Sequence, residues 1–265
     1  AIMEAGSAAV GAGAFDAGIR SFGTAAGLAD GAGLAPLRIS ARVSLAEVLI
    51  HSLRGFDEEG LARLYEADEI AQEHHLGDAM AQTRAELGYV DFLRARYDRA
   101  ERWLREALRY GAGSLSVKAK ATTYLGSVES DRANYAQAAG LLRAAVELAQ
   151  AASEPRRQAY ALAMLGRIDL LRGELIAAAS DLEASIKLAE HDHWLAFLPW
   201  PQALLGETWL TGGDRSGAAR LLRQAFARTV ANAASKDPGR AARDHLCPKL
   251  SAQRRARQPQ LSLCN

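Results

Sequence analysis

The dipeptide Leu-Gly recurs at a nearly fixed interval along this chain. It lies at Leu87-Gly88, Leu125-Gly126, Leu165-Gly166 and Leu205-Gly206, with spacings of 38, 40 and 40 residues. A constant period of this size is typical of a stacked repeat array. We therefore expect repeated units of one structure, which work through an extended surface and not through a closed catalytic pocket.

The residues that follow each Leu-Gly pair also repeat, with a small residue twelve positions after the Gly and a leucine four positions later. Another small residue comes three positions beyond the leucine, directly before an apolar one. Offsets of 4, 7 and 8 place these residues on one face of a helix. The small residues and leucines are Ala100, Ala138, Ala178 and Ala218, then Leu104, Leu142, Leu182 and Leu222.

A short turn is expected between the helix that contains Leu-Gly and the helix that follows. A small residue occupies it in each unit, namely Ala95, Ala133, Gly173 and Gly213. A residue at this place often adopts a left-handed conformation, which Gly tolerates best. At Ala95 and Ala133 the sequence leaves two alternatives, a strained left-handed residue or a turn that stays right-handed.

These patterns predict an all-α protein, a right-handed superhelical array of about six antiparallel helix hairpins. The pattern is fainter in the first two units. Each hairpin alone cannot bury its apolar face, so stacking of neighbours supplies the core. We expect hairpins near residues 1–33, 37–76, 77–111, 114–152, 155–192 and 196–234.

Residues 235–265 differ in composition from the repeats. Lys236 to Asn265 contain seven Lys or Arg and two Asp or Glu, a net charge of +5, whereas residues 1–235 contain 25 basic and 29 acidic residues, a net of −4. Both cysteines, Cys247 and Cys264, lie there. Three interpretations stay open: an irregular extension, a basic arm for nucleic acid or membrane, or a segment foreign to the repeats, such as a shifted reading frame would produce.

The repeat region shows no recognisable catalytic chemistry. It lacks a phosphate-binding loop and a nucleophile elbow, so we expect no enzyme activity, no catalytic residue and no cofactor. The histidines of His74-His75 and of His191 and His193 are each expected at the end of a second helix, where imidazole suits the helix dipole, and we predict no metal site. No apolar run is long enough to span a membrane, and a repeat body without cysteine suits the cytoplasm.

Aromatic residues are scarce, at 6% of the chain, yet they cluster before the last Leu-Gly pair. The segment from His193 to Pro201 contains Trp194, Phe197 and Trp200. Pro199 and Pro201 exclude a regular helix interior, but either could start a helix. The segment is interpreted as an apolar plug between repeats or, alternatively, as an aromatic anchor for a partner.

Residues 1–230 resemble tetratricopeptide repeats. The resemblance lies in the Leu-Gly pair of the first helix, in the small turn residue and the aromatic or apolar residue two positions after it, and in the small–Leu–small pattern of the second helix. The period exceeds that family's usual 34 residues, and no unit has its early Trp. The long variant resembles the repeat domain of large bacterial LuxR-type regulators of the maltose-activator kind. The run from Phe197 to Glu207, followed by Gly213-Asp214 and Leu221-Leu222, is similar to actinobacterial members.

This resemblance implies a sensing and protein-interaction module in a transcriptional regulator. In that family an ATPase precedes the repeats and a helix-turn-helix follows them, and this chain shows neither. Its implied partners are a protein, a peptide or a small-molecule inducer, with no direct binding to nucleic acid or membrane. A free-standing scaffold or adaptor is the alternative function, and the sequence sets no oligomeric state.

In such arrays ligands usually lie against the first helices. In each unit, two residues of the first helix should project toward such a ligand. One directly follows the Leu-Gly pair, and the other lies five positions before the Leu of that pair. The candidate binding residues are Tyr89, Ser127, Arg167 and Glu207, and Gln82, Lys120, Tyr160 and Trp200. Their mixed charge favours no single polyanion or acidic peptide.

Overall fold

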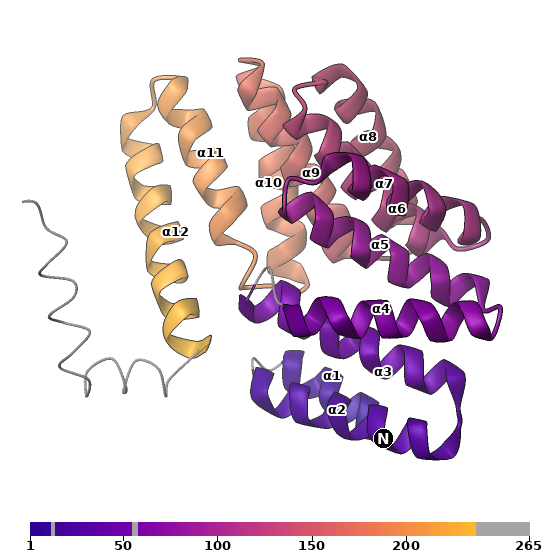
Figure 1. Cartoon of the computed structure of the whole chain (residues 1–265). Helices are drawn as coiled ribbons and strands as arrows, with labels where there is room; N and C mark the ends of the chain where they lie inside the picture. The colour runs from indigo at the N-terminus through magenta and orange to yellow at the C-terminus, as the bar shows by residue number, and fades with distance from the viewer. Residues whose placement is uncertain (12–13, 55–57, 237–265) are drawn as a thin grey trace, which may run out of the picture.

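The computed structural model describes residues 1–11, 14–54 and 58–236. These residues form twelve α-helices and one π-helical segment, and no strand occurs among them (Figure 1). The predicted all-α fold is therefore confirmed. Nearly all of the predicted tail, and both cysteines, lie outside the described residues.

The helices pair in chain order into hairpins. The two N-terminal hairpins consist of α1 (Ile2–Gly11) with α2 (Phe15–Ala32), and of α3 (Ala35–Glu47), extended by the π-helical η1 (Val48–Arg54), with α4 (Glu58–Glu73). The next are α5 (Gly77–Leu93) with α6 (Tyr97–Tyr110), and α7 (Leu115–Asp131) with α8 (Tyr135–Ala151). The last are α9 (Pro155–Leu171) with α10 (Leu175–His191), and α11 (Pro199–Thr211) with α12 (Arg215–Lys236).

The recurring glycine has a packing role within each hairpin. A Cβ atom added to Gly126 would lie 2.6 Å from Cγ of Leu142, and one added to Gly166 would lie 2.5 Å from Cγ of Leu182. The same pairing joins Gly88 with Leu104 and Gly206 with Leu222. The leucine of the second helix therefore occupies the space that a side chain at the glycine would need, which explains why the two residues recur together.

Left-handed residues end most of the helices. Ala95 and Ala133 adopt φ values of 54° and 63°, so the turns at these alanines are left-handed, as they are at Gly173 and Gly213. The next residue closes the turn, since the N–H of Asn134 donates to the carbonyl oxygen of Glu129 at 2.9 Å. This is the hydrogen-bond pattern of a Schellman cap, and it stabilises the helix end despite the strain at alanine.

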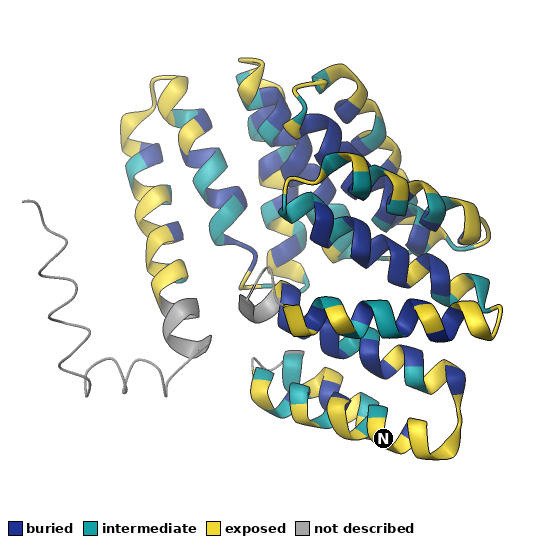
Figure 2. Ribbon diagram, in the orientation of Figure 1, coloured by how far each residue is buried: buried dark blue, intermediate teal, exposed yellow. Residues whose placement is uncertain are grey.

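Stacking buries the apolar stripes of the inner hairpins. Leu104, Leu142 and Leu182 are completely buried. Each second helix packs against the first helix of the following hairpin, as in α6 with α7, α8 with α9 and α10 with α11. Figure 2 shows the result as dark blue faces through α5, α7 and α9, whereas α12 at the end of the array is mostly yellow.

The first helices also touch one another across hairpins. α3 contacts α5, α5 contacts α7, α7 contacts α9, and α9 contacts α11. Over the described ranges, successive second helices make no comparable contact. The first helices are therefore closer together and form the inner side of the array.

None of the helices in the described ranges is long and apolar enough to cross a membrane.

Candidate binding face on the first helices

A row of aromatic rings runs along the inner side, with one ring from each successive hairpin. His51 of η1 stacks on Tyr89 of α5, with ring centroids 4.6 Å apart, and Tyr89 stacks on Tyr124 of α7 at 4.5 Å. Tyr124 meets the ring of Tyr160 of α9 edge-on at 6.4 Å, and Tyr160 lies 5.5 Å from Trp200 of α11. We call these five residues the aromatic row.

The positions of these rings follow from helical spacing. Tyr160 and Trp200 lie five residues before the Leu of Leu-Gly, Tyr124 lies one before it, and Tyr89 lies two after it. Offsets of four and seven residues place these positions on one side of a helix. Because the first helices contact each other, rings on this side meet those of the next hairpin.

Beside the row lies a cluster of charged groups from three hairpins, which we call the ion cluster. It consists of Glu47 of α3, Glu86 of α5 and Lys120 of α7. The Lys120 Nζ atom lies 3.1 Å from Glu47 Oε1 and also contacts Glu86. The other carboxylate oxygen of Glu86 lies 2.8 Å from Nε2 of His51. The cluster thus joins residues up to 73 positions apart in the sequence.

The ion cluster is held in its charged form. Burial alone would raise the pKa of Glu86, but the charge of Lys120 and the bond to His51 outweigh it, so the pKa is held well below its usual range. Burial likewise opposes the charge of Lys120, yet the two carboxylates raise its pKa. The charges on this face are therefore largely compensated internally.

The tyrosines of the row remain neutral phenols. Burial raises the pKa of Tyr160 to about 12 and raises those of Tyr89 and Tyr124 further. These phenols therefore stay uncharged over the whole physiological pH range.

The predicted binding residues fall into two groups. Tyr89, Lys120, Tyr160 and Trp200 come together in the aromatic row and the ion cluster. Ser127, in contrast, is completely buried, and its hydroxyl donates to the carbonyl oxygen of Thr123 at 3.0 Å.

The other three predicted residues lie apart from the row. Arg167 donates to the hydroxyl of Ser130 at 2.8 Å and lies 3.3 Å from Asp131. Gln82 borders a hollow of about 330 Å³ between α3 and the start of α5. Glu207 is exposed on α11. Whether any of the eight residues contacts a partner stays a prediction.

Two prominent members of this face, Glu86 and Tyr124, were not predicted. Both lie directly before the Leu of Leu-Gly, four residues after the position of Gln82 and Lys120. The four-residue spacing was the signal that could have identified them. Glu47 and His51 carried no such signal, because the Leu-Gly pair is missing from their hairpin.

The aromatic segment before α11 has a packing role, and one of its prolines starts the helix. Trp194 stacks on Phe197 with ring centroids 4.1 Å apart, and Phe197 is buried against Tyr160 and Trp200. Helix α11 begins at Pro199. The segment therefore closes the gap between hairpins, and it also extends the aromatic row by one ring.

The histidine pairs lie where second helices end. His75 and His193 adopt left-handed conformations, with φ values of 54° and 52°, directly after α4 and α10. In the part of the chain that the structure describes, no group of three or more His, Cys, Asp or Glu is placed to hold a metal ion.

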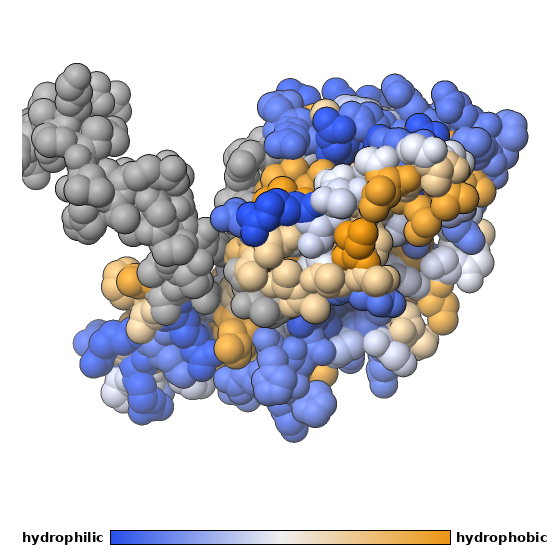
Figure 3. Space-filling model, turned by 90° about the horizontal axis from the view of Figure 1, so that it is seen from below, coloured by the Kyte–Doolittle hydropathy of each residue, from blue (hydrophilic) through white to orange (hydrophobic). Residues whose placement is uncertain are grey.

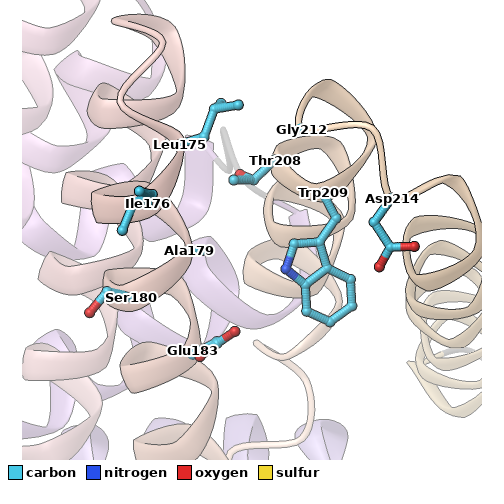
Figure 4. A pocket seen from close by; sticks show the side chains of 9 residues that line it. All are labelled: Leu175, Ile176, Ala179, Ser180, Glu183, Thr208, Trp209, Gly212 and Asp214. Carbon is cyan, nitrogen blue, oxygen red and sulfur yellow. The ribbon is translucent and has the colours of Figure 1, made fainter.

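A larger hollow of about 430 Å³ lies between α10 and the α11–α12 hairpin. Leu175, Ile176 and Trp209 form its apolar wall, and Glu183 and Asp214 lie at its edge (Figure 4). Residues of only two hairpins line this hollow. The aromatic row joins five hairpins, so the row is the better candidate for an extended binding face.

No family model matches the sequence, and no match was found among curated proteins. Several solved structures are similar in fold. BtubC (BKLC) from P. vanneervenii is 19% identical, with a TM-score of 0.60 over 82% of this chain and 92% of that one. The apo form of RapI is 15% identical, with a TM-score of 0.67 over 90% and 84%. YrrB, a TPR protein, is 22% identical over 71% and 84%, with a TM-score of 0.40. At these identities the similarities concern the fold alone, an all-α solenoid.

Proposed function

We propose that this chain is a non-enzymatic binding module that receives a protein or peptide partner along its first helices. The aromatic row carries the proposal. Rings from five hairpins contact each other along the inner side. Tyr89, Tyr160 and Trp200 are partly exposed there, whereas Tyr124 is buried. Aromatic side chains of this kind are enriched where proteins bind one another, because they offer much contact area at a low cost in side-chain entropy.

The compensated charges beside the row define the kind of partner. Glu47 and Glu86 share the single positive charge of Lys120, so the face has no excess of positive charge to attract a phosphate-rich or strongly acidic ligand. Apolar and aromatic side chains would contact the exposed parts of the row, and backbone groups would bond to its hydroxyls. We therefore expect a peptide segment rich in apolar residues.

The resemblance to LuxR-type regulators supports a role for this module in a cytoplasmic bacterial transcription factor, of the kind found in actinobacteria. The module would sense a protein partner or a small-molecule inducer and pass that state to an ATPase elsewhere in the protein. A free-standing scaffold is the second candidate function. Sequencing the gene's flanks separates the two, because a regulator would encode an ATPase and a helix-turn-helix there.

The binding face can be tested with a library of displayed peptides selected on the full chain. We expect selected peptides to be rich in apolar and aromatic residues. Tyr89→Leu keeps much of the bulk of the side chain but removes the hydroxyl and the ring that stacks on His51 and Tyr124. It should weaken binding about tenfold, equivalent to roughly 1.4 kcal/mol. Ile176→Leu, on the outer side of α10, is the matched control and should leave the affinity unchanged.

Melting temperatures of both variants show whether the array is still folded. Equal affinities for wild type and Tyr89→Leu, with unchanged melting, would refute the aromatic row as the binding face.

A further inference from the structure

The hollow between α10 and the α11–α12 hairpin combines an apolar wall with two acidic groups. Leu175, Ile176 and Trp209 line it, and in Figure 4 the indole ring of Trp209 stands between the carboxylates of Glu183 and Asp214. None of the residues that line the hollow belongs to the aromatic row or the ion cluster. A ligand in this hollow therefore does not occupy the face proposed above.

At the previous junction of the array, between α8 and the α9–α10 hairpin, two arginines lie near the corresponding place. Burial and the charge of Glu174 raise the pKa of Asp169, and the charges of Arg143 and Arg172 oppose this rise. Both guanidinium groups are therefore near the Asp169 carboxylate, one from α8 and one from the turn after α9.

An arginine in the turn after the first helix is a repeated feature. Arg94, Arg132 and Arg172 each lie six residues after the repeated glycine. Arg94 donates at 2.6 Å to Glu58, the first residue of α4, and Arg132 donates at 2.6 Å to Asp98, near the start of α6. A guanidinium group thus bridges a second helix and the hairpin that follows it.

The last junction has neither arginine of the previous one. Forty residues later in the repeat, the chain has Glu183 in place of Arg143, Trp209 in place of Asp169 and Gly212 in place of Arg172. All three replacements line the hollow. Here the space that arginine side chains take up elsewhere is open, and an aromatic ring takes the place of the buried acid.

The two carboxylates of the hollow are available to a cationic ligand. The N–H of Gly217 and the hydroxyl of Ser216 donate to Oδ1 of Asp214, at 2.9 Å and 3.0 Å. These bonds, with a smaller contribution from the charge of Arg220, lower the pKa of Asp214 and keep it ionised at neutral pH. Within the described part of the chain, neither Asp214 nor the exposed Glu183 forms an ion pair.

We propose that the hollow binds an arginine side chain of a partner peptide. The guanidinium group stacks on Trp209 and donates to Glu183 and Asp214, and its methylene groups lie along Leu175 and Ile176. The planar guanidinium combines ring stacking with forked hydrogen bonds to carboxylates, which makes arginine a better occupant than lysine. Figure 3 shows hydrophilic and hydrophobic surface side by side at the left of the molecule, where the α11–α12 hairpin lies, and an arginine side chain offers contacts of both kinds.

NMR titration of the full chain with a blocked pentapeptide, one arginine flanked by alanines, tests this inference. The indole N–H signal of Trp209, identified by its loss in Trp209→Phe, should shift and then saturate. The same peptide with citrulline, which keeps the shape of arginine without its charge, should bind at least about tenfold more weakly, because charged hydrogen bonds are the stronger ones.

Removal of the two acidic charges is the corresponding test on the protein. Glu183→Gln combined with Asp214→Asn should weaken binding of the arginine peptide about tenfold, since two ion pairs are lost. Asparagine still caps α12 at this position, so the fold is kept. Asp78→Asn combined with Glu147→Gln removes the same charge from exposed sites on α5 and α8 and should leave the affinity unchanged.

A third variant, Gly212→Arg, restores the arginine of the repeat. Gly212 has a right-handed backbone with a φ value of −76°, and an added Cβ atom would lie no closer than 3.5 Å to its neighbours, so the variant fits the turn. Its own side chain should fill the hollow and abolish peptide binding, whereas Gly212→Ala should bind the peptide like wild type.

A wild type without a saturable shift, equal binding of the citrulline peptide, or binding that survives Gly212→Arg would each overturn the proposal. Melting temperatures show whether each variant is folded. Tyr89→Leu should bind the arginine peptide like wild type, so this test and the test of the aromatic row are independent.

Discussion

Helices α8 and α12 carry the same stripe of residues at the same positions of the repeat, but within the described residues a following hairpin packs only on α8. Leu142 of α8 is fully buried, whereas its counterpart Leu222 is 36% exposed. Val146 is half-buried between hairpins, and its counterpart Phe226 is 70% exposed. The sequence pattern therefore determines which side of a helix is apolar, but only a neighbouring hairpin determines whether that side is buried.

Truncation of Leu142 and of Leu222 to alanine should give the largest difference between α8 and α12. Leu142→Ala should lower the free energy of unfolding by about 2–5 kcal/mol, because it removes a buried side chain and leaves a cavity between α7, α8 and α9. Leu222→Ala should cost roughly half as much or less, because part of that side chain is already in water.

Urea denaturation of both variants gives the two values. The surface variant Gln82→Ala serves as a control and should change stability by about 0.5 kcal/mol or less. Equal losses for the two leucines would mean that α12 is covered as completely as α8.

The glycines opposite these leucines give a second, smaller contrast. Gly166→Ala places a Cβ atom 2.5 Å from Cγ of the buried Leu182 and should cost about 1–3 kcal/mol through overpacking. Gly206→Ala places one 2.8 Å from Cγ of Leu222, which can move outward into solvent.

Thermal unfolding should therefore show a smaller loss for Gly206→Ala than for Gly166→Ala. A larger loss at Gly206 would contradict the view that the last hairpin is the looser one.

A third contrast concerns buried acids three residues after the repeated glycine. Asp91 lies 3.1 Å from Arg99, and Glu129 lies 3.1 Å from Arg132. At Asp169 one carboxylate oxygen is buried without a hydrogen-bond partner. Burial, together with the negative charge of Glu174, raises the pKa of Asp169, although Arg143 and Arg172 oppose this effect.

A raised pKa means that the ionised Asp169 destabilises the fold above that pKa. This destabilisation disappears as the pH falls through the raised pKa toward the ordinary aspartate value of about 3.9. Asp169→Asn should therefore stabilise the protein at neutral pH by about 1 kcal/mol, and the gain should shrink in acid. Asp91→Asn should destabilise it, because Arg99 loses its charged partner.

Denaturation curves at neutral and mildly acidic pH measure both effects. A destabilised Asp169→Asn variant at neutral pH would show that Asp169 is paired.

Much of the fold could be predicted because the repeat marks it directly. The Leu-Gly pair and the leucine sixteen residues after the glycine touch within one hairpin, so their contact depends on local spacing alone. The turns were located for the same reason, although the conformation of Ala95 and Ala133 was left open. The candidate face was predicted in part. Tyr89, Lys120, Tyr160 and Trp200 follow the repeat period and lie on it. Ser127 follows the same period but is buried, so the period alone does not identify a surface residue.

The helices, their apolar sides and the packing of glycine on leucine follow from the amino-acid pattern alone, because these features depend on residues a few turns apart. Which side chains meet between hairpins depends instead on how the hairpins stack. Lys120 lies near Glu47, 73 residues away, because α3, α5 and α7 converge on the inner side. The exposure of Phe226 has the same origin, since burial depends on the neighbour that stacks on a helix and not on the helix itself.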